Sequence, residues 1–147
     1  MTNRPKGEHG PEARLRTMRI LWAVFLMNVG LLALVTRFGA PDEREVEGVP
    51  PLLYALAAAA LSAVVASFVL KASFYRRAAE LREPARVQTG FIVALALCES
   101  AALMGMVGVF VTLCDYSYAL FALGALGMVL HFPRREQVFA PYYKSTM

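Results

Sequence analysis

One acidic residue, Glu99, lies inside a long apolar stretch and is the strongest candidate for chemistry in this sequence. It stands 13 residues after Arg86 and 16 residues before Asp115, which places it near the middle of any helix through that stretch. At the centre of a membrane-spanning helix a carboxylate costs about 2.5 kcal/mol or more and marks a functional-site candidate. No Lys or Arg lies within the apolar stretches, so desolvation there favours the neutral acid.

Two polar residues in neighbouring apolar stretches, Asn28 and Ser62, could lie at the same depth as Glu99. On a helix of about 100° per residue, Glu99 points away from a stripe of small side chains that should pack against another helix. Ser62 belongs to a matching stripe, so Asn28 is the better partner. Glu99, Asn28 and Ser62 are therefore the candidate ion-binding residues, and a helix–helix hydrogen bond is the alternative. The two small stripes are Gly90, Ala94, Ala101, Gly105 and Gly108, and Ala55, Ala59, Ser62 and Ala66.

The elements that must position these residues are four apolar stretches at 20–36, 51–70, 89–114 and 116–132. The 147 residues are 58% hydrophobic, with a mean hydropathy of +0.50. A helix needs roughly 20 residues to cross a bilayer, so we predict an all-α, polytopic membrane protein with four transmembrane helices. Three spans would remain if the first stretch were a cleaved signal peptide. A retained signal anchor is the better interpretation, because Phe38 stands where cleavage requires a small residue.

Charge predicts the orientation of these helices. The N-terminal tail, the segment between the second and third stretches and the C-terminal tail are basic, whereas the first loop is acidic. Positive loops face the cytoplasm, so we expect an N-in/C-in, multi-pass protein of the cell (inner) membrane. The net charge of +4 is then explained by topology and anionic lipid headgroups. We expect the lipid bilayer as a partner and no nucleic acid.

The organisation is a single transmembrane unit with two tails. We predict a polar cytoplasmic tail at 1–17, a four-helix domain at 18–133 and a second cytoplasmic tail at 134–147. The segment 71–83 contains no Gly or Pro, so the second helix should continue to Pro84, which stops it. The second and third helices should form a central, tightly packed hairpin.

The stretch 51–114 resembles the c subunit (proteolipid) of rotary ATP synthases. Arg82, Pro84 and Arg86 lie in a segment similar to that family's cytoplasmic turn, and the run from Ala96 to Ala101 resembles its carboxylate-bearing helix. The resemblance implies a helical hairpin in which Glu99 binds a transported proton or sodium ion. The second helix here has alanines and serines where the family has glycines, and the first and fourth helices are additional.

No other constellation indicates chemistry. Cys98 and Cys114 lie roughly 24 Å apart along one helix and cannot pair; His9 and His131 have no second ligand at metal-like spacing. We expect no metal, no cofactor and no enzyme activity. Two function classes follow: ion translocation through Glu99, in a homo-oligomer or a larger membrane complex, and a structural or accessory subunit without transport of its own.

Overall fold

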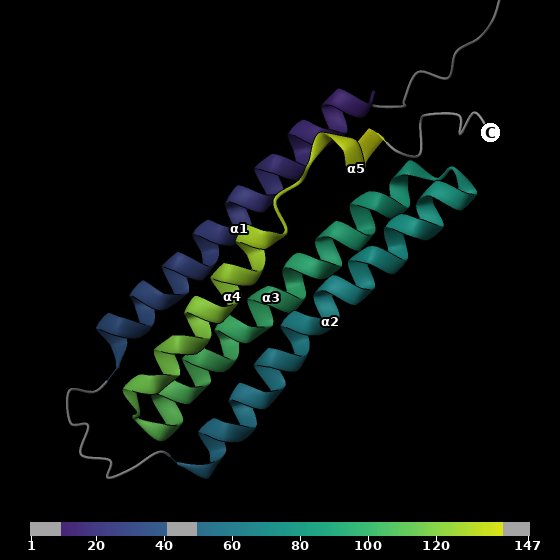
Figure 1. The fold of residues 1–147 in the computed structure, drawn as a ribbon. Helices are drawn as coiled ribbons and strands as arrows, with labels where there is room; N and C mark the ends of the chain where they lie inside the picture. Colours follow the sequence, from purple (N-terminus) through teal and green to yellow (C-terminus); the bar gives the residue numbers. More distant parts are fainter. Residues whose placement is uncertain (1–9, 41–49, 140–147) are drawn as a thin grey trace, which may run out of the picture.

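The structure is a computed structural model that describes residues 10–40 and 50–139, and the described residues are helical with no strand (Figure 1). The predicted all-α class is confirmed. Three long helices come first, followed by a short 3-10 turn and two shorter helices. In chain order they are α1 (Pro11–Gly39), α2 (Pro51–Leu81), α3 (Pro84–Thr112), η1 (Asp115–Ser117), α4 (Tyr118–Leu130) and α5 (Arg135–Phe139).

Local sequence sets the ends of the long helices. Each begins with a proline in its first turn, where the missing N–H costs no intrahelical hydrogen bond. α2 ends at Leu81 because Arg82 takes the left-handed conformation, with φ 53°. Pro84 then starts α3 after a two-residue turn, so α2 does extend past its apolar stretch almost to Pro84, as predicted.

Three helices are long and apolar enough to cross a membrane, and the apolar 18-residue stretches within α1, α2 and α3 have mean hydropathies of 2.1, 2.2 and 2.0. Their lengths of 29, 31 and 29 residues correspond to about 45 Å each. These features indicate a small membrane protein. α4 has only 13 residues, or about 20 Å, which is less than the hydrocarbon core of about 30 Å. Three of the four predicted spans are thus matched by long helices, and the fourth span stays a prediction.

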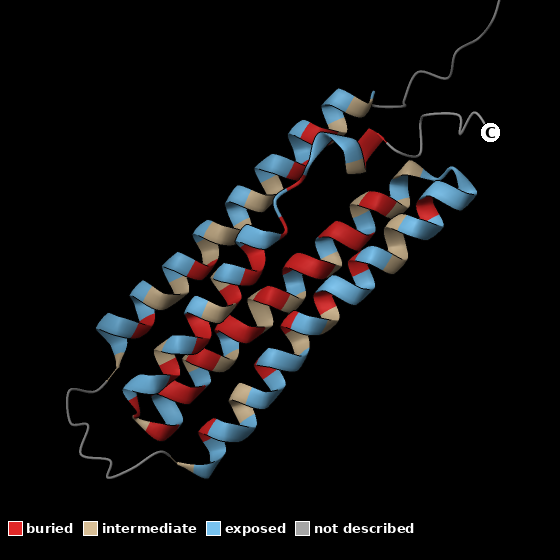
Figure 2. Cartoon of the chain, viewed as in Figure 1, coloured by how far each residue is buried: buried red, intermediate tan, exposed pale blue. Residues whose placement is uncertain are grey.

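α3 lies at the centre of the bundle. Its most extensive contacts are with α2, followed by α4 and α1, so the predicted central hairpin of the second and third helices is confirmed. Buried residues concentrate along α3 and the side of α4 that faces it, whereas the outer faces of α1 and α2 are exposed (Figure 2). The exposed residues of α1 and α2 are largely apolar, as expected of helices that face lipid.

The predicted pairing of small-residue stripes is wrong for α2. Ala55, Ala59 and Ser62 are exposed, and α2 instead turns Ala60, Val64 and Ser67 inward. The stripe on α3 is divided between two neighbours. Gly90 meets Phe74 of α2, whereas Gly105 meets Phe121 of α4. The physical reason is that α3 is covered on several sides, so its small residues serve more than one helix contact.

The ends of the chain contain more structure than the two predicted tails. α1 starts at Pro11, so part of the predicted 1–17 tail is helical and Leu15 is buried. In the predicted 134–147 tail, α5 buries Phe139. Both segments carry apolar side chains that pack against the bundle end. The acidic part of the first loop, at 41–49, and the last residues, 140–147, lie outside the described residues.

Candidate functional site

Asn28 of α1 and Glu99 of α3 form a hydrogen-bonded pair between two helices. Asn28 Nδ2 donates to Glu99 Oε1, and both side chains are half-buried. No described residue donates to the second carboxyl oxygen, Oε2, and no described Lys or Arg forms an ion pair with Glu99. The structure therefore brings together the two residues that the sequence paired as best partners.

Further contacts of α1 fix the position of Asn28. Its inward face buries Met18, Val29 and Thr36, and the Trp22 indole Nε1 donates to the carbonyl of Met128 at 2.7 Å. Spacings of seven and eleven residues keep this face on one side of the helix. This hydrogen bond ties α1 to α4, because Met128 belongs to α4.

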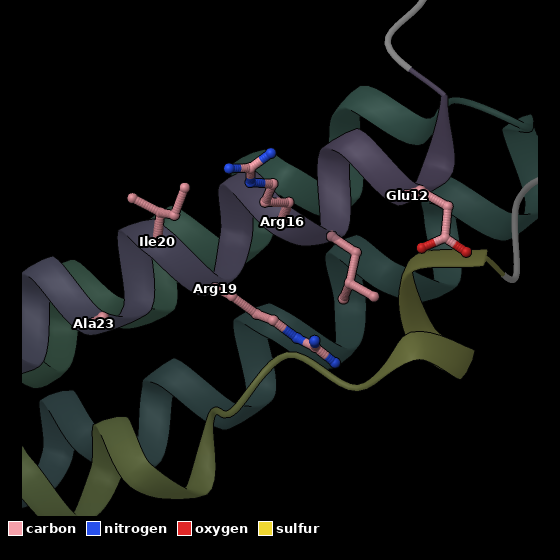
Figure 3. Close-up of a pocket in the computed structure, with 6 residues that line it drawn as sticks. Glu12, Arg16, Arg19, Ile20 and Ala23 are labelled. Carbon is pink, nitrogen blue, oxygen red and sulfur yellow. The ribbon is translucent and has the colours of Figure 1, made fainter.

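The N-terminal end of α1 is held by charged side chains. Glu12 forms an ion pair with Arg135 of α5, and Figure 3 shows Glu12 directed toward α5 and Arg19 toward the segment that follows α4. Arg19 lies over the Phe132 ring, 5.8 Å from its centre. The hollow in Figure 3 is lined by residues of α1 alone, so it is a surface depression that encloses no ligand site.

The structure does not place the third candidate, Ser62, with Glu99. Ser62 is exposed on the outer face of α2, and its hydroxyl donates to the Ala58 carbonyl of its own helix at 2.8 Å. In the turn between α2 and α3, Arg82 is exposed, Pro84 begins α3 and Arg86 pairs with Glu83. These turn residues lie at the end of the hairpin, well separated in sequence from Glu99.

A second polar cluster, which was not among the predicted site residues, lies between α2, α3 and the end of α4. We call it the Ser67 cluster; its members are Ser67, Lys71, Cys98 and His131. Ser67 Oγ lies 2.8 Å from His131 Nε2, and Cys98 Sγ lies 3.5 Å from the same hydroxyl. Lys71 Nζ donates to the His131 carbonyl at 3.3 Å. His131 is 1% exposed and Lys71 is 7% exposed.

The early end of α4 explains why polar groups gather there. α4 stops at Leu130, while α2 and α3 continue past it (Figure 1). The chain then turns at His131 and continues as α5, so polar side chains fill space that a longer apolar helix would occupy. His131 also contacts the Phe68 ring, with 4.3 Å between ring centres.

A pocket of about 300 Å³ opens beside this cluster, and we call it the basal pocket. Its polar lining comes from α2 and from the segment after α4. Two polar atoms near it, Tyr75 Oη and Gln137 Oε1, are buried and have no hydrogen-bond partner. Buried polar atoms are normally paired, so these two groups need an explanation. The lining includes Phe68, Lys71, Tyr75, His131, Arg134 and Gln137.

A spacing signal for the Ser67 cluster was present in the sequence. Ser67 and Lys71 are four residues apart and therefore share one helix face. Taken singly, Lys71 is assigned to the basic segment that follows the second apolar stretch, and His131 to the end of the fourth stretch, where a cation suits the helix C-terminus. Neither assignment used the fact that a polar face on α2 requires polar partners on the helix packed against it.

Within 10–40 and 50–139 no three His, Cys, Asp or Glu side chains gather as a metal site. Cys98 and Cys114 are buried free thiols. No protein-family model, curated protein or solved structure matches the chain. The function must therefore be argued from the two polar sites themselves.

Proposed function

We propose that this chain is a structural or accessory subunit of a membrane assembly, in which the Asn28–Glu99 pair fastens α1 to the central hairpin. The observation that carries this proposal is that Glu99 has a neutral amide partner on another helix of the same chain. An amide satisfies a carboxyl group in an apolar setting, where an unpaired one would be costly. α1 also covers the carboxyl on one side, whereas the resemblance to a rotor proteolipid requires it to face a partner.

A double-mutant cycle tests this role. Asn28→Ala and Glu99→Ala should each destabilise the folded chain, and the pair should show a coupling energy of about 0.6 kcal/mol and not above about 1.7 kcal/mol, the mean and the maximum for side-chain hydrogen bonds between membrane helices. The measurement is reversible unfolding in mixed micelles.

The matched control replaces Glu99→Ala with Ser100→Ala. Ser100 is the next residue on α3, and its hydroxyl donates to the Leu97 carbonyl of its own helix at 2.7 Å. Its coupling to Asn28→Ala should be near zero. If the Asn28–Glu99 coupling equals that of the control, the fastening role is wrong.

Ion carriage by Glu99 is a second candidate, and one observation favours it. Oε2 receives no hydrogen bond from any described residue and the side chain is half-buried, so this oxygen could take up a proton or contribute to a sodium site. The resemblance of 51–114 to proteolipids agrees with such a role. A homo-oligomer or a larger membrane complex would then supply the rest of the pathway.

A carbodiimide reaction separates the two candidates, because the reagent modifies protonated membrane carboxyl groups. Fast labelling of Glu99 that declines as the pH rises supports ion carriage, and an inert Glu99 rules it out. Glu99→Gln keeps an acceptor for Asn28, so the chain should assemble while labelling and proton flux in proteoliposomes vanish. The oligomeric state in mild detergent adds a second criterion, since a ring supports carriage and a monomer argues against it.

A further inference from the structure

The basal pocket holds a buried cation that lacks a counter-charge. Lys71 is 7% exposed, and no described carboxylate forms an ion pair with it. Its ammonium lies 5.4 Å from the centre of the Tyr75 ring and 5.8 Å from that of Phe91. Cation–π contacts and one carbonyl compensate only part of the loss of water around an ammonium group.

A second cation shares the pocket. Arg134 lines it and lies close enough for its charge to act unfavourably on Lys71. The lining contains no Asp or Glu. Two like charges and no acid are unfavourable in an empty pocket, but they suit an anion that binds between them.

The unpartnered polar atoms indicate the kind of anion. The Tyr75 hydroxyl is a donor without an acceptor, and a half-turn of the Gln137 side-chain amide brings its NH2 group, with two N–H donors, to the position of the unpartnered Oε1. A phosphate group has several acceptor oxygens in different directions. It can therefore engage both cations and both neutral donors at once.

We propose that the basal pocket binds the phosphate group of an anionic phospholipid, with Lys71 and Arg134 as counter-charges and Tyr75 and Gln137 as hydrogen-bond donors. The rim of the pocket favours a lipid over a soluble phosphate compound. Phe68, Leu130 and Phe132 line it and are 39%, 62% and 44% exposed, which gives acyl chains an apolar surface next to the charged base.

The position of the pocket agrees with a lipid ligand. Among the described residues, every Lys and Arg except Arg37 belongs to the end of the bundle that carries α5. By the positive-inside rule this end faces the cytoplasmic leaflet, where anionic lipids are found. Basic pockets between transmembrane helices on that side are suited to phospholipid headgroups.

The single tryptophan provides a probe for this site. Trp22 packs edge-on against Phe132, with 5.1 Å between ring centres, so a bromine-labelled acyl chain at the rim should quench its fluorescence. The full chain is reconstituted in phosphatidylcholine vesicles, and brominated phosphatidylglycerol or brominated phosphatidylcholine is added in increasing fractions. We expect half-maximal quenching at about a fivefold lower fraction of phosphatidylglycerol, the effect of one cation near the headgroups.

Variants that remove one positive charge test whether the preference for phosphatidylglycerol arises in the basal pocket. Arg134→Gln and Lys71→Gln should each reduce it, whereas Arg77→Gln should keep it, because Arg77 is exposed on α2 and does not line the pocket. Arg134 is exposed, so Arg134→Gln should fold even if Lys71→Gln does not, and the proposal can then be tested with Arg134→Gln alone. Equal losses for Arg77→Gln and Arg134→Gln would mean general surface attraction and would overturn the proposal, as would equal quenching by the two lipids.

Inorganic phosphate distinguishes the two sources of the ligand. With a lipid ligand, millimolar inorganic phosphate should leave the preference for phosphatidylglycerol unchanged, beyond the effect of the same ionic strength of sodium chloride. If phosphate abolishes the preference and chloride does not, the pocket takes a soluble phosphate and the lipid assignment is wrong.

Discussion

The Asn28–Glu99 pair and the Ser67 cluster are both polar interruptions of an apolar bundle, but their charges are balanced differently. Glu99 receives a hydrogen bond from a neutral amide on α1, so this acid has a polar partner within the chain. Lys71 is more deeply buried and has only a carbonyl and aromatic rings as partners among the described residues. A completed pair contributes to helix cohesion, whereas an unbalanced cation costs stability until an anion binds.

The most destabilising change that we predict separates α4 from α3, the one helix that contributes to both polar sites. A Cβ atom at Gly124 of α4 would lie 2.6 Å from the backbone oxygen of Cys98, which cannot move away easily. Gly124→Val should therefore force α4 off α3 and destabilise the protein by about 1–3 kcal/mol or more. The measurement is the midpoint of thermal unfolding in detergent, with Trp22 fluorescence as the reporter of the α1–α4 contact.

The control for this prediction is Gly30→Val. Gly30 lies on the exposed face of α1, and nothing comes within 4 Å of a Cβ atom built there. This variant should unfold like the parent protein. If Gly124→Val also unfolds like the parent, the close contact of α4 with α3 is wrong, and the placement of His131 beside Ser67 loses its support.

Substitutions at Lys71 and at Glu99 should change the stability of the protein in opposite directions. Lys71→Met removes an uncompensated buried cation and keeps most of the side-chain volume, so in neutral detergent it should raise the free energy of unfolding by about 1 kcal/mol. Glu99→Leu leaves the Asn28 amide without its acceptor and should lower it by about 1–3 kcal/mol. Thermal unfolding of both variants and the parent protein under identical conditions shows whether the free energy of unfolding rises for Lys71→Met and falls for Glu99→Leu.

Added phosphatidylglycerol should reverse the result for Lys71. The parent protein should then gain stability from the bound headgroup, and the Lys71→Met variant should gain little, because a ligand stabilises only the state that binds it. A Lys71→Met variant that is destabilised in neutral detergent would contradict the view that this lysine lacks internal compensation.

Much of the fold could be predicted because each helix is defined by its own sequence. Continuous apolar runs locate α1, α2 and α3, the prolines at 51 and 84 mark the starts of two of them, and the absence of breakers in 71–83 predicts the extension of α2. The start of α1 at Pro11 lies within the predicted tail and was not anticipated. The face that each helix turns inward is harder to predict. Ala55, Ala59 and Ser62 matched the α3 stripe in size. Lipid tails are, however, as apolar as the side chains of a helix interface, so no hydrophobic driving force decides which apolar face of a helix turns toward its neighbours.

The two polar sites differ in how far the sequence reveals them. Glu99 and Asn28 stand out because each interrupts an apolar run near its centre. Lys71 stands at the boundary of an apolar run and begins a basic segment, which is where a solvated lysine is expected. His131 stands at the end of α4, and its contact with Ser67 depends on the short length of α4. Pro133 limits how far α4 can continue, but which side chain of α2 meets His131 is decided by the packing of α4 against α2 and α3, which the local sequence does not encode.

The smallest expected effect concerns the hydrogen bond at the centre of the Ser67 cluster. Ser67→Ala removes the hydroxyl that lies 2.8 Å from His131 Nε2 and leaves a buried imidazole nitrogen without a partner, so the protein should lose about 1 kcal/mol of stability. Ser62→Ala is the matched control on the same helix, since Ser62 is exposed and bonds only to its own helix; its change should stay within about 0.5 kcal/mol. The His131 ring resonances, followed by nuclear magnetic resonance, should shift in the first variant alone. Equal losses for the two serines, with His131 unmoved, would mean that the Ser67 cluster is not a connected hydrogen-bonded unit and that Lys71 must be treated as an isolated buried charge.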